Sequence, residues 1–113
     1  PNRKSRYKEN IMTEVSGIIK RITSYSNDLT EVELVPSYKS QFKNINFIYH
    51  GRVDERYLGH NVRLEEVSDG VLRQRLICAD FCLEAEATQE KQDLAWKIRG
   101  PRIQVESNLS FDD

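Results

Sequence analysis

The stretch of residues 45–67 constrains the fold of this chain more than any other. It holds two runs with the alternation of a β-strand, joined by a short charged connection that ends in Leu58-Gly59. Ser68-Asp69-Gly70 follows, and an Asp-Gly step after an alternating run is typical of a hairpin. Because side chains on a strand alternate between two faces, such runs predict a sheet with one buried face. The rest of the chain must pair with this unit or cover it.

Five segments have the composition of strands. The first is rich in β-branched residues, but its apolar residues do not keep one parity, so we expect a bulge or strong coil there, with Gly17 absorbing the bend. The second alternates cleanly and presents Glu31 and Glu33 on its outer surface. In the third, Phe47 and Tyr49 are expected to face the core. The predicted strands are residues 15–26, 30–35, 45–53, 62–67 and 71–83.

The character of the sequence changes after the fifth run. Residues 84–100 contain mostly helix formers, with Leu94 and Ile98 one turn apart, and Gly100-Pro101 follows as a stop signal. The apolar stripe of this segment is thin, so we expect a helix that either docks loosely on the sheet or remains available to a partner. Residues 102–105 are compatible with a short additional strand.

The composition of the chain bounds its class. At 113 residues it is long enough for one hydrophobic core. A formal charge of −1 gives no bulk electrostatic argument for nucleic acid or an anionic membrane. No run reaches the roughly 18 consecutive apolar residues of a membrane helix, and the polar N-terminus lacks the apolar core of a signal peptide. The two cysteines are therefore expected to be reduced thiols in a cytoplasmic protein that does not bind a membrane.

Three features of the chain occur in order: a long opening run with a glycine, a short second run after a turn, and a Leu-Gly-x-x-Val step before the fourth run. They are Val15-Ser16-Gly17-Ile18-Ile19, Thr30-Glu31-Val32-Glu33-Leu34 and Leu58-Gly59-His60-Asn61-Val62. This order resembles the OB-fold, a five-stranded β-barrel, over residues 13–83, without identifying a specific family. Many OB-folds carry a clear helix between the third and fourth strands, and this chain has only a short connection there. An SH3-like small barrel and an irregular β-sandwich are therefore the alternatives.

The predicted fold is mostly β: a small five-stranded OB-like barrel with a C-terminal helix and flexible ends. On this basis the chain divides into a flexible basic arm at residues 1–12, the barrel at 13–83, the helix at 84–100 and a tail at 101–113.

The resemblance to the OB-fold implies a non-enzymatic module that binds single-stranded DNA or RNA across the outer face of the second and third strands. Such binding needs aromatic rings that stack on bases and cations that follow the phosphates. Glu31 and Glu33 oppose it, because they lie where phosphate would bind. The candidate nucleic-acid-binding residues are Tyr38, Lys39, Phe42, Lys43, His50, Arg52, Arg63, Arg73 and Arg75.

The alternative function is a protein-interaction or assembly module without nucleic-acid binding. Tryptophan and arginine are favoured anchors of protein interfaces. An exposed Ile48 and a weakly anchored helix would suit a partner surface, although Trp96 is also compatible with simply covering one end of the barrel. The candidate partner-binding residues are Ile48, Leu94, Trp96 and Ile98, and the oligomeric state is left open.

Neither a metal centre nor a catalytic site is predicted. Cys78 and Cys82 fall inside a predicted strand rather than in a zinc knuckle, so packing suffices to explain them. Glu65 and Glu66 are neighbours on a strand and point to opposite faces, which prevents them from acting as a catalytic pair. No nucleophile elbow or glycine-rich phosphate loop occurs, so we expect no enzyme activity and no cofactor.

Overall fold

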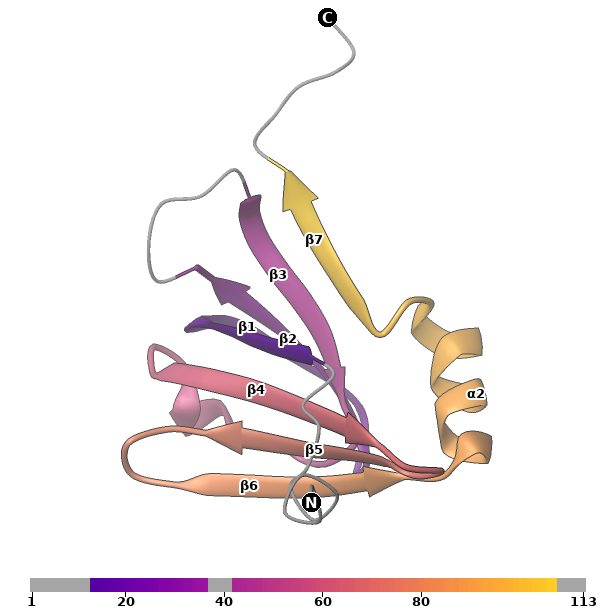
Figure 1. The fold of residues 1–113 in the computed structure, drawn as a ribbon. Coiled ribbons are helices and arrows are strands. Elements are labelled where there is room, and N and C mark those ends of the chain that lie inside the picture. The colour runs from indigo at the N-terminus through magenta and orange to yellow at the C-terminus, as the bar shows by residue number, and fades with distance from the viewer. Residues whose placement is uncertain (1–12, 37–41, 108–113) are drawn as a thin grey trace, which may run out of the picture.

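A computed structural model describes residues 13–36 and 42–107. Within them, seven strands form one antiparallel sheet in the order β6-β5-β4-β1-β2-β3-β7, which leaves β6 and β7 at its edges (Figure 1). The strands are β1 (Thr13–Ser26), β2 (Leu29–Val35), β3 (Phe42–Tyr49), β4 (Asn61–Ser68), β5 (Leu72–Ile77), β6 (Cys82–Ala87) and β7 (Ile103–Ser107). The helical elements are the single turn η1 (Glu55–Tyr57) and α2 (Gln89–Arg99). The prediction of a mostly β chain is confirmed, but the sheet is open and has seven strands, so the predicted closed five-stranded barrel is wrong.

The long strand β1 makes the sheet coil. Residues 13–18 pair with β4, whereas residues 18–26 pair with β2. The two halves of the sheet therefore share one strand and curve around a common core. Phe47 and Tyr49 lie in that core, as predicted from their parity. The buried members of the core are Ile19, Val32, Leu34, Phe47, Tyr49, Val53, Val62, Leu64 and Leu76.

A bulge in β1 explains its imperfect alternation. The pairing with β2 shifts between Ile19 and Arg21, so Ile19 and Ile22 both contact the core while Ile18 stays exposed. Gly17 lies just before this shift. A Cβ atom at Gly17 would stand 2.4 Å from the carbonyl oxygen of Val35, so this position requires glycine because two backbones approach closely.

Two predictions for the C-terminal third are wrong in their boundaries. The predicted strand 71–83 is two strands, because the chain turns between them with a 2.8 Å bond from Cys78 N–H to the Phe81 carbonyl. The predicted helix 84–100 begins only at Gln89, since residues 84–87 complete β6. The short strand considered for residues 102–105 is present as β7, which spans Ile103–Ser107. The segment 84–87 contains good helix formers, but pairing with β5 overrides that weak preference.

The edge of β3 is completed by two different elements. Up to Phe47 it pairs with β7. Beyond that point Gln74 of β5 reaches across the core: its Nε2 donates to the carbonyl of Ile48 at 2.7 Å, and its Oε1 accepts from the N–H of His50 at 2.7 Å. An adjacent parallel strand would make the same two bonds with its backbone. A single side-chain amide thus links β5 to β3 where no strand pairing occurs.

Two charged residues hold this amide in place. Gln74 Nε2 also donates to the carboxylate of Glu66, which in turn accepts from Nε of Arg102 at 2.8 Å. Glu66 is completely buried. The chain after α2 is therefore tied to β4 and, through Gln74, to β5 and β3.

In the part of the chain that the structure describes, no helix is long and apolar enough to cross a membrane.

Candidate functional site

The helix α2 lies against the outer face of β2 and β3, the face on which an OB-like module would bind its ligand. Thr88 caps its first turn by accepting from the N–H of Lys91, and the positive φ of 96° at Gly100 turns the chain towards β7. Ala95 is the buried residue of this helix, and it packs against Leu29 and Ile48. Because so little apolar surface anchors α2, polar contacts must supply much of its attachment.

Two ion pairs connect α2 to the sheet. Arg99 Nη2 lies 2.7 Å from a carboxylate oxygen of Glu31, and Lys91 Nζ lies 3.5 Å from Asp28. The hydrogen bond from Arg99 lowers the pKa of Glu31 below its usual value. The other strand-β2 carboxylate, Glu33, bonds to Arg21 and Asn44. The acidic surface predicted for β2 is therefore neutralised by neighbouring side chains rather than presented to solvent.

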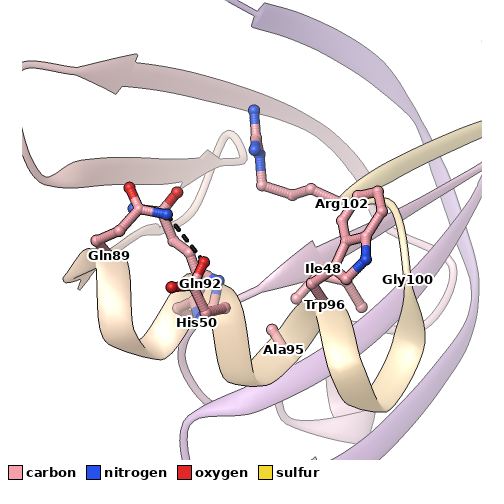
Figure 2. Close-up of a pocket in the computed structure, with 9 residues that line it drawn as sticks. Ile48, His50, Gln89, Gln92, Ala95, Trp96, Gly100 and Arg102 are labelled. Atoms are coloured by element: carbon pink, nitrogen blue, oxygen red, sulfur yellow. Dashed lines mark hydrogen bonds between the residues drawn. The ribbon is translucent and has the colours of Figure 1, made fainter.

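A pocket of about 170 Å³ lies between β3 and α2 (Figure 2). Its apolar wall comes from Ile48 and Ala95, and the figure shows Trp96 and Arg102 at one end with Gln89 and Gln92 at the other. The pocket is lined by Ile48, His50, Gln89, Gln92, Asp93, Ala95, Trp96, Gly100 and Arg102.

His50 gives the pocket a neutral polar wall. Burial lowers the pKa of its imidazole below 6.5, so the ring is neutral near pH 7. The charge of Asp28 raises this pKa, whereas the charges of Arg102 and Lys91 lower it. His50 was predicted to be an outward-facing ligand of phosphate, and the structure places it beneath α2 with only 6% of its surface exposed.

The four predicted partner-binding residues divide into three groups. Ile48 is 2% exposed, so the expectation that it is exposed is wrong: α2 covers it. Trp96 is 62% exposed at the pocket, so it does not serve to cover an end of the sheet. Leu94 and Ile98 are also exposed, and helix geometry puts them on the opposite flank of α2 from Trp96. Ile48 and Trp96 come together in one pocket although they stand 48 positions apart in the sequence.

The nine predicted nucleic-acid-binding residues do not form one cluster in the described structure. Tyr38 and Lys39 lie outside the described residues, as do the side chains of Phe42 and Lys43 at the start of β3. Arg52 is exposed in the connection that follows β3.

The remaining three arginines lie on β4 and β5 rather than on the β2–β3 face. Each lies near two carboxylates: Arg63 is within 3.5 Å of Glu14 and Glu65, Arg73 is within 3.7 Å of Asp69 and Glu86, and Arg75 is within 3.9 Å of Glu65 and Glu84. These cations belong to an ion-pair lattice, which reduces their availability for phosphate.

Sequence analysis missed the importance of Glu66, Gln74 and Arg102. A signal for two of them was present, because Glu66 continues the inward parity of Val62 and Leu64, and Gln74 stands between two core leucines. A polar residue at a core position must be paired, so both positions predicted a buried network. Their partners on β3 and after α2 are far away in sequence and gave no comparable signal.

The cysteines and the second histidine lie apart from the pocket. Cys78 is half-buried against the core, Cys82 is exposed on β6, and both are free thiols. His60 contacts the rings of Tyr57 and Phe81. Residues 13–36 and 42–107 contain no group of three or more histidine, cysteine or acidic side chains placed to hold a metal ion.

Comparison with protein-family models, curated proteins and solved structures gave no match to this chain.

Proposed function

We propose that this chain is a non-enzymatic protein-docking module whose pocket between β3 and α2 receives one apolar side chain of a partner. The observation that carries the proposal is Trp96, which stands 62% exposed beside a concave site with an apolar wall. Interface hot spots have this form: a tryptophan next to a pocket that excludes water when filled. A volume of about 170 Å³ suits one side chain and is below the 300 Å³ or more of typical small-molecule sites.

The polar residues around the pocket favour a peptide over a phosphate-bearing ligand. Gln89 and Gln92 supply amide oxygens that can accept from a peptide backbone, while their Nε2 groups donate to Asp93 and to the Ala87 carbonyl. His50 is neutral near pH 7. The cations nearby already face carboxylates, since Arg102 pairs with Glu66 and Arg99 with Glu31. A phosphate would have to compete with these pairs, whereas an apolar side chain with a flanking backbone would not.

A titration with a minimal anchor tests the proposal. N-acetyl-phenylalanine amide has about 15 non-hydrogen atoms, so at about 0.3 kcal/mol per atom its Kd is roughly 1 mM. We expect it to shift the backbone amide resonances of Ile48, His50 and Ala95, and N-acetyl-aspartic acid amide to leave them unchanged. W96A should abolish the shifts. The matched control is L94A on the other flank of the same helix, which should bind like the natural chain.

Equal binding by W96A and the natural chain would reject the pocket as the docking site. An equal response to the aspartic acid amide would show that the probe does not discriminate apolar from charged ligands.

Single-stranded nucleic acid is the second candidate ligand, favoured by the exposed Trp96 ring beside Arg102. An exposed aromatic ring next to a cation is the pairing that stacks bases and follows a backbone. The test is the fluorescence anisotropy of labelled DNA and RNA oligomers at about 50 and 200 mM salt. Nucleic-acid binding would fall steeply between these salt concentrations, and W96A should abolish it because the ring that stacks the bases is lost. Binding that is absent even at the lower salt concentration would eliminate this candidate.

A further inference from the structure

We infer that the free edge of β6 is a second binding site, which accepts an extended basic segment of a partner protein as an additional strand of the sheet. The segment carries lysine or arginine at alternate positions. This site is independent of the proposed pocket, because it lies at the edge of the sheet formed by β6 (Figure 1).

The backbone of β6 is available for pairing up to Glu86, since the carbonyl of Ala87 at its end accepts a hydrogen bond from Gln92 Nε2. Its six residues pair with β5 in an unbroken register. Within the described residues, the backbone–backbone bonds outside the strand ladders do not involve residues 82–87. Neither proline nor a bulge interrupts this edge, although such features usually protect exposed edges. The other edge strand, β7, differs, because its pairing with β3 contains a register shift.

The charges on the outer face select a basic strand. Two rows of side chains cross the sheet and end in glutamates at β6: Arg73 faces Glu86 at 3.5 Å, and Arg75 faces Glu84 at 3.7 Å. Each arginine is shared with a second carboxylate, from Asp69 and Glu65 respectively. Glu84 and Glu86 are thus each only partly neutralised, because the arginine that each of them faces is shared with a second carboxylate.

A strand added to the edge of β6 would extend both rows by one residue each. Glu84 and Glu86 are 71% and 68% exposed, and they are separated by two residues along β6. Cations at positions i and i+2 of an added strand stand directly beside them, because cross-strand neighbours on one face share this spacing. Opposite-charge cross-strand pairs stabilise a sheet, whereas an acidic strand would place like charges side by side.

The inner face of β6 determines which residues should stand between the cations of the added strand. Leu83 and Ala85 point inward from β6 and remain half-buried at the edge. An added strand places its alternate residues next to them. Apolar β-branched residues there would cover the exposed part of Leu83. The ligand is thus an extended segment that alternates cationic and apolar side chains.

The probe is a fluorescein-labelled heptapeptide, Thr-Lys-Val-Lys-Val-Lys-Thr, with blocked ends, titrated by anisotropy against the full chain. Two further peptides carry methyl groups on backbone nitrogens. The first is methylated at the backbone nitrogen of every lysine, and the second at the backbone nitrogen of both valines. In a strand, alternate N–H groups point to opposite edges, so only one methylated set removes bonds to β6. We expect one methylated peptide to bind roughly tenfold or more weakly and the other to bind like the parent.

Protein variants test the charge requirement. E84Q/E86Q should weaken the affinity for the peptide by roughly tenfold. E55Q/E90Q removes the same charge from exposed sites elsewhere and should change the affinity by less than about twofold. Bound peptide should slow amide hydrogen exchange in residues 82–87, and W96A should leave this binding intact. The inference is overturned if both methylated peptides bind like the parent. It is also overturned if E55Q/E90Q weakens binding as much as E84Q/E86Q. Either result would show that the peptide is attracted to the protein by charge alone.

Discussion

The carboxylate of Glu66, which is fully buried, forms an ion pair with the guanidinium of Arg102, with 2.8 Å between Oε1 and Nε. Glu66 belongs to β4, and Arg102 follows α2, so this pair joins the sheet to the segment that covers it. A buried carboxylate is costly unless it is paired and hydrogen-bonded. The position of α2, and hence the shape of the pocket, depends on this contact.

Removing Arg102 should destabilise the fold. R102A leaves Glu66 buried with Gln74 as its remaining partner, and breaking a buried pair in this way costs about 3 kcal/mol. The free energy of unfolding from a denaturant titration measures it. R73A is the control, because Arg73 and its partners Asp69 and Glu86 are all about half exposed or more, and such pairs contribute less than about 1 kcal/mol each. Equal losses in the two variants would contradict this account of Glu66.

Replacing Gln74 tests the link between β5 and β3. Q74L keeps the volume but removes the partners of the Ile48 carbonyl, the His50 N–H and one oxygen of Glu66. Each unpaired buried group costs about 1–3 kcal/mol, so we expect a total loss of roughly 3 kcal/mol.

Amide hydrogen exchange gives the specific readout for Q74L. The N–H of His50 should lose its protection from exchange. Amides in the β1–β4 ladder should still exchange only through global unfolding. Q89L, at an exposed position on α2, should change stability by less than about 0.5 kcal/mol. Unchanged protection at His50 in Q74L would show that the amide link is not formed.

Gly17 should not tolerate a side chain. In G17A the new Cβ would stand 2.4 Å from the Val35 carbonyl oxygen, so β1 and β2 would have to separate. Overpacking of this kind costs about 2 kcal/mol. S16A, the neighbouring exposed position on β1, should lie within about 0.5 kcal/mol of the natural chain. Thermal unfolding of both variants measures the difference, and an equally stable G17A would refute the close approach.

His50 should make stability depend on pH. Burial lowers the pKa of the folded imidazole, while the unfolded value stays near 6.5. Below pH 6.5 the unfolded chain binds more protons than the folded chain, so stability falls as the pH drops from 6.5 towards the folded pKa. The slope from this residue is at most about 1.4 kcal/mol per pH unit. Denaturant titrations of the natural chain and H50Q between pH 7.5 and 5 should show the slope in the former alone, and parallel curves would disprove it.

Local alternation located the first four strands, although β3 spans Phe42–Tyr49 rather than the predicted residues 45–53. Three of them have a period-two pattern with one apolar face, while β1 changes parity at its bulge. Turn residues such as Asn27-Asp28 and Asp69-Gly70 mark the strand ends. Alternation failed in the fifth run, because Cys78 and Phe81 are apolar enough to continue a strand although the chain turns between them. It failed again at residues 84–87, where helix formers alternate in a strand whose pairing depends on β5.

The candidate site was less predictable than the strands. The outward parity of Ile48 and His50 was correct, but parity does not reveal what covers a face, and α2 covers this one. That position depends on contacts between distant residues, above all Arg99 with Glu31 and Arg102 with Glu66. Each is an ordinary charged residue in sequence, so no local pattern identifies its partner.

Intermolecular NOEs from N-acetyl-phenylalanine amide test the pocket most directly. The ring protons of the bound probe should give NOEs to the methyl groups of Ile48 and Ala95, which line the pocket, and to the indole of Trp96. NOEs only to Leu94 and Ile98, which lie on the other flank of α2, would show that the probe binds elsewhere and would contradict the proposed docking site.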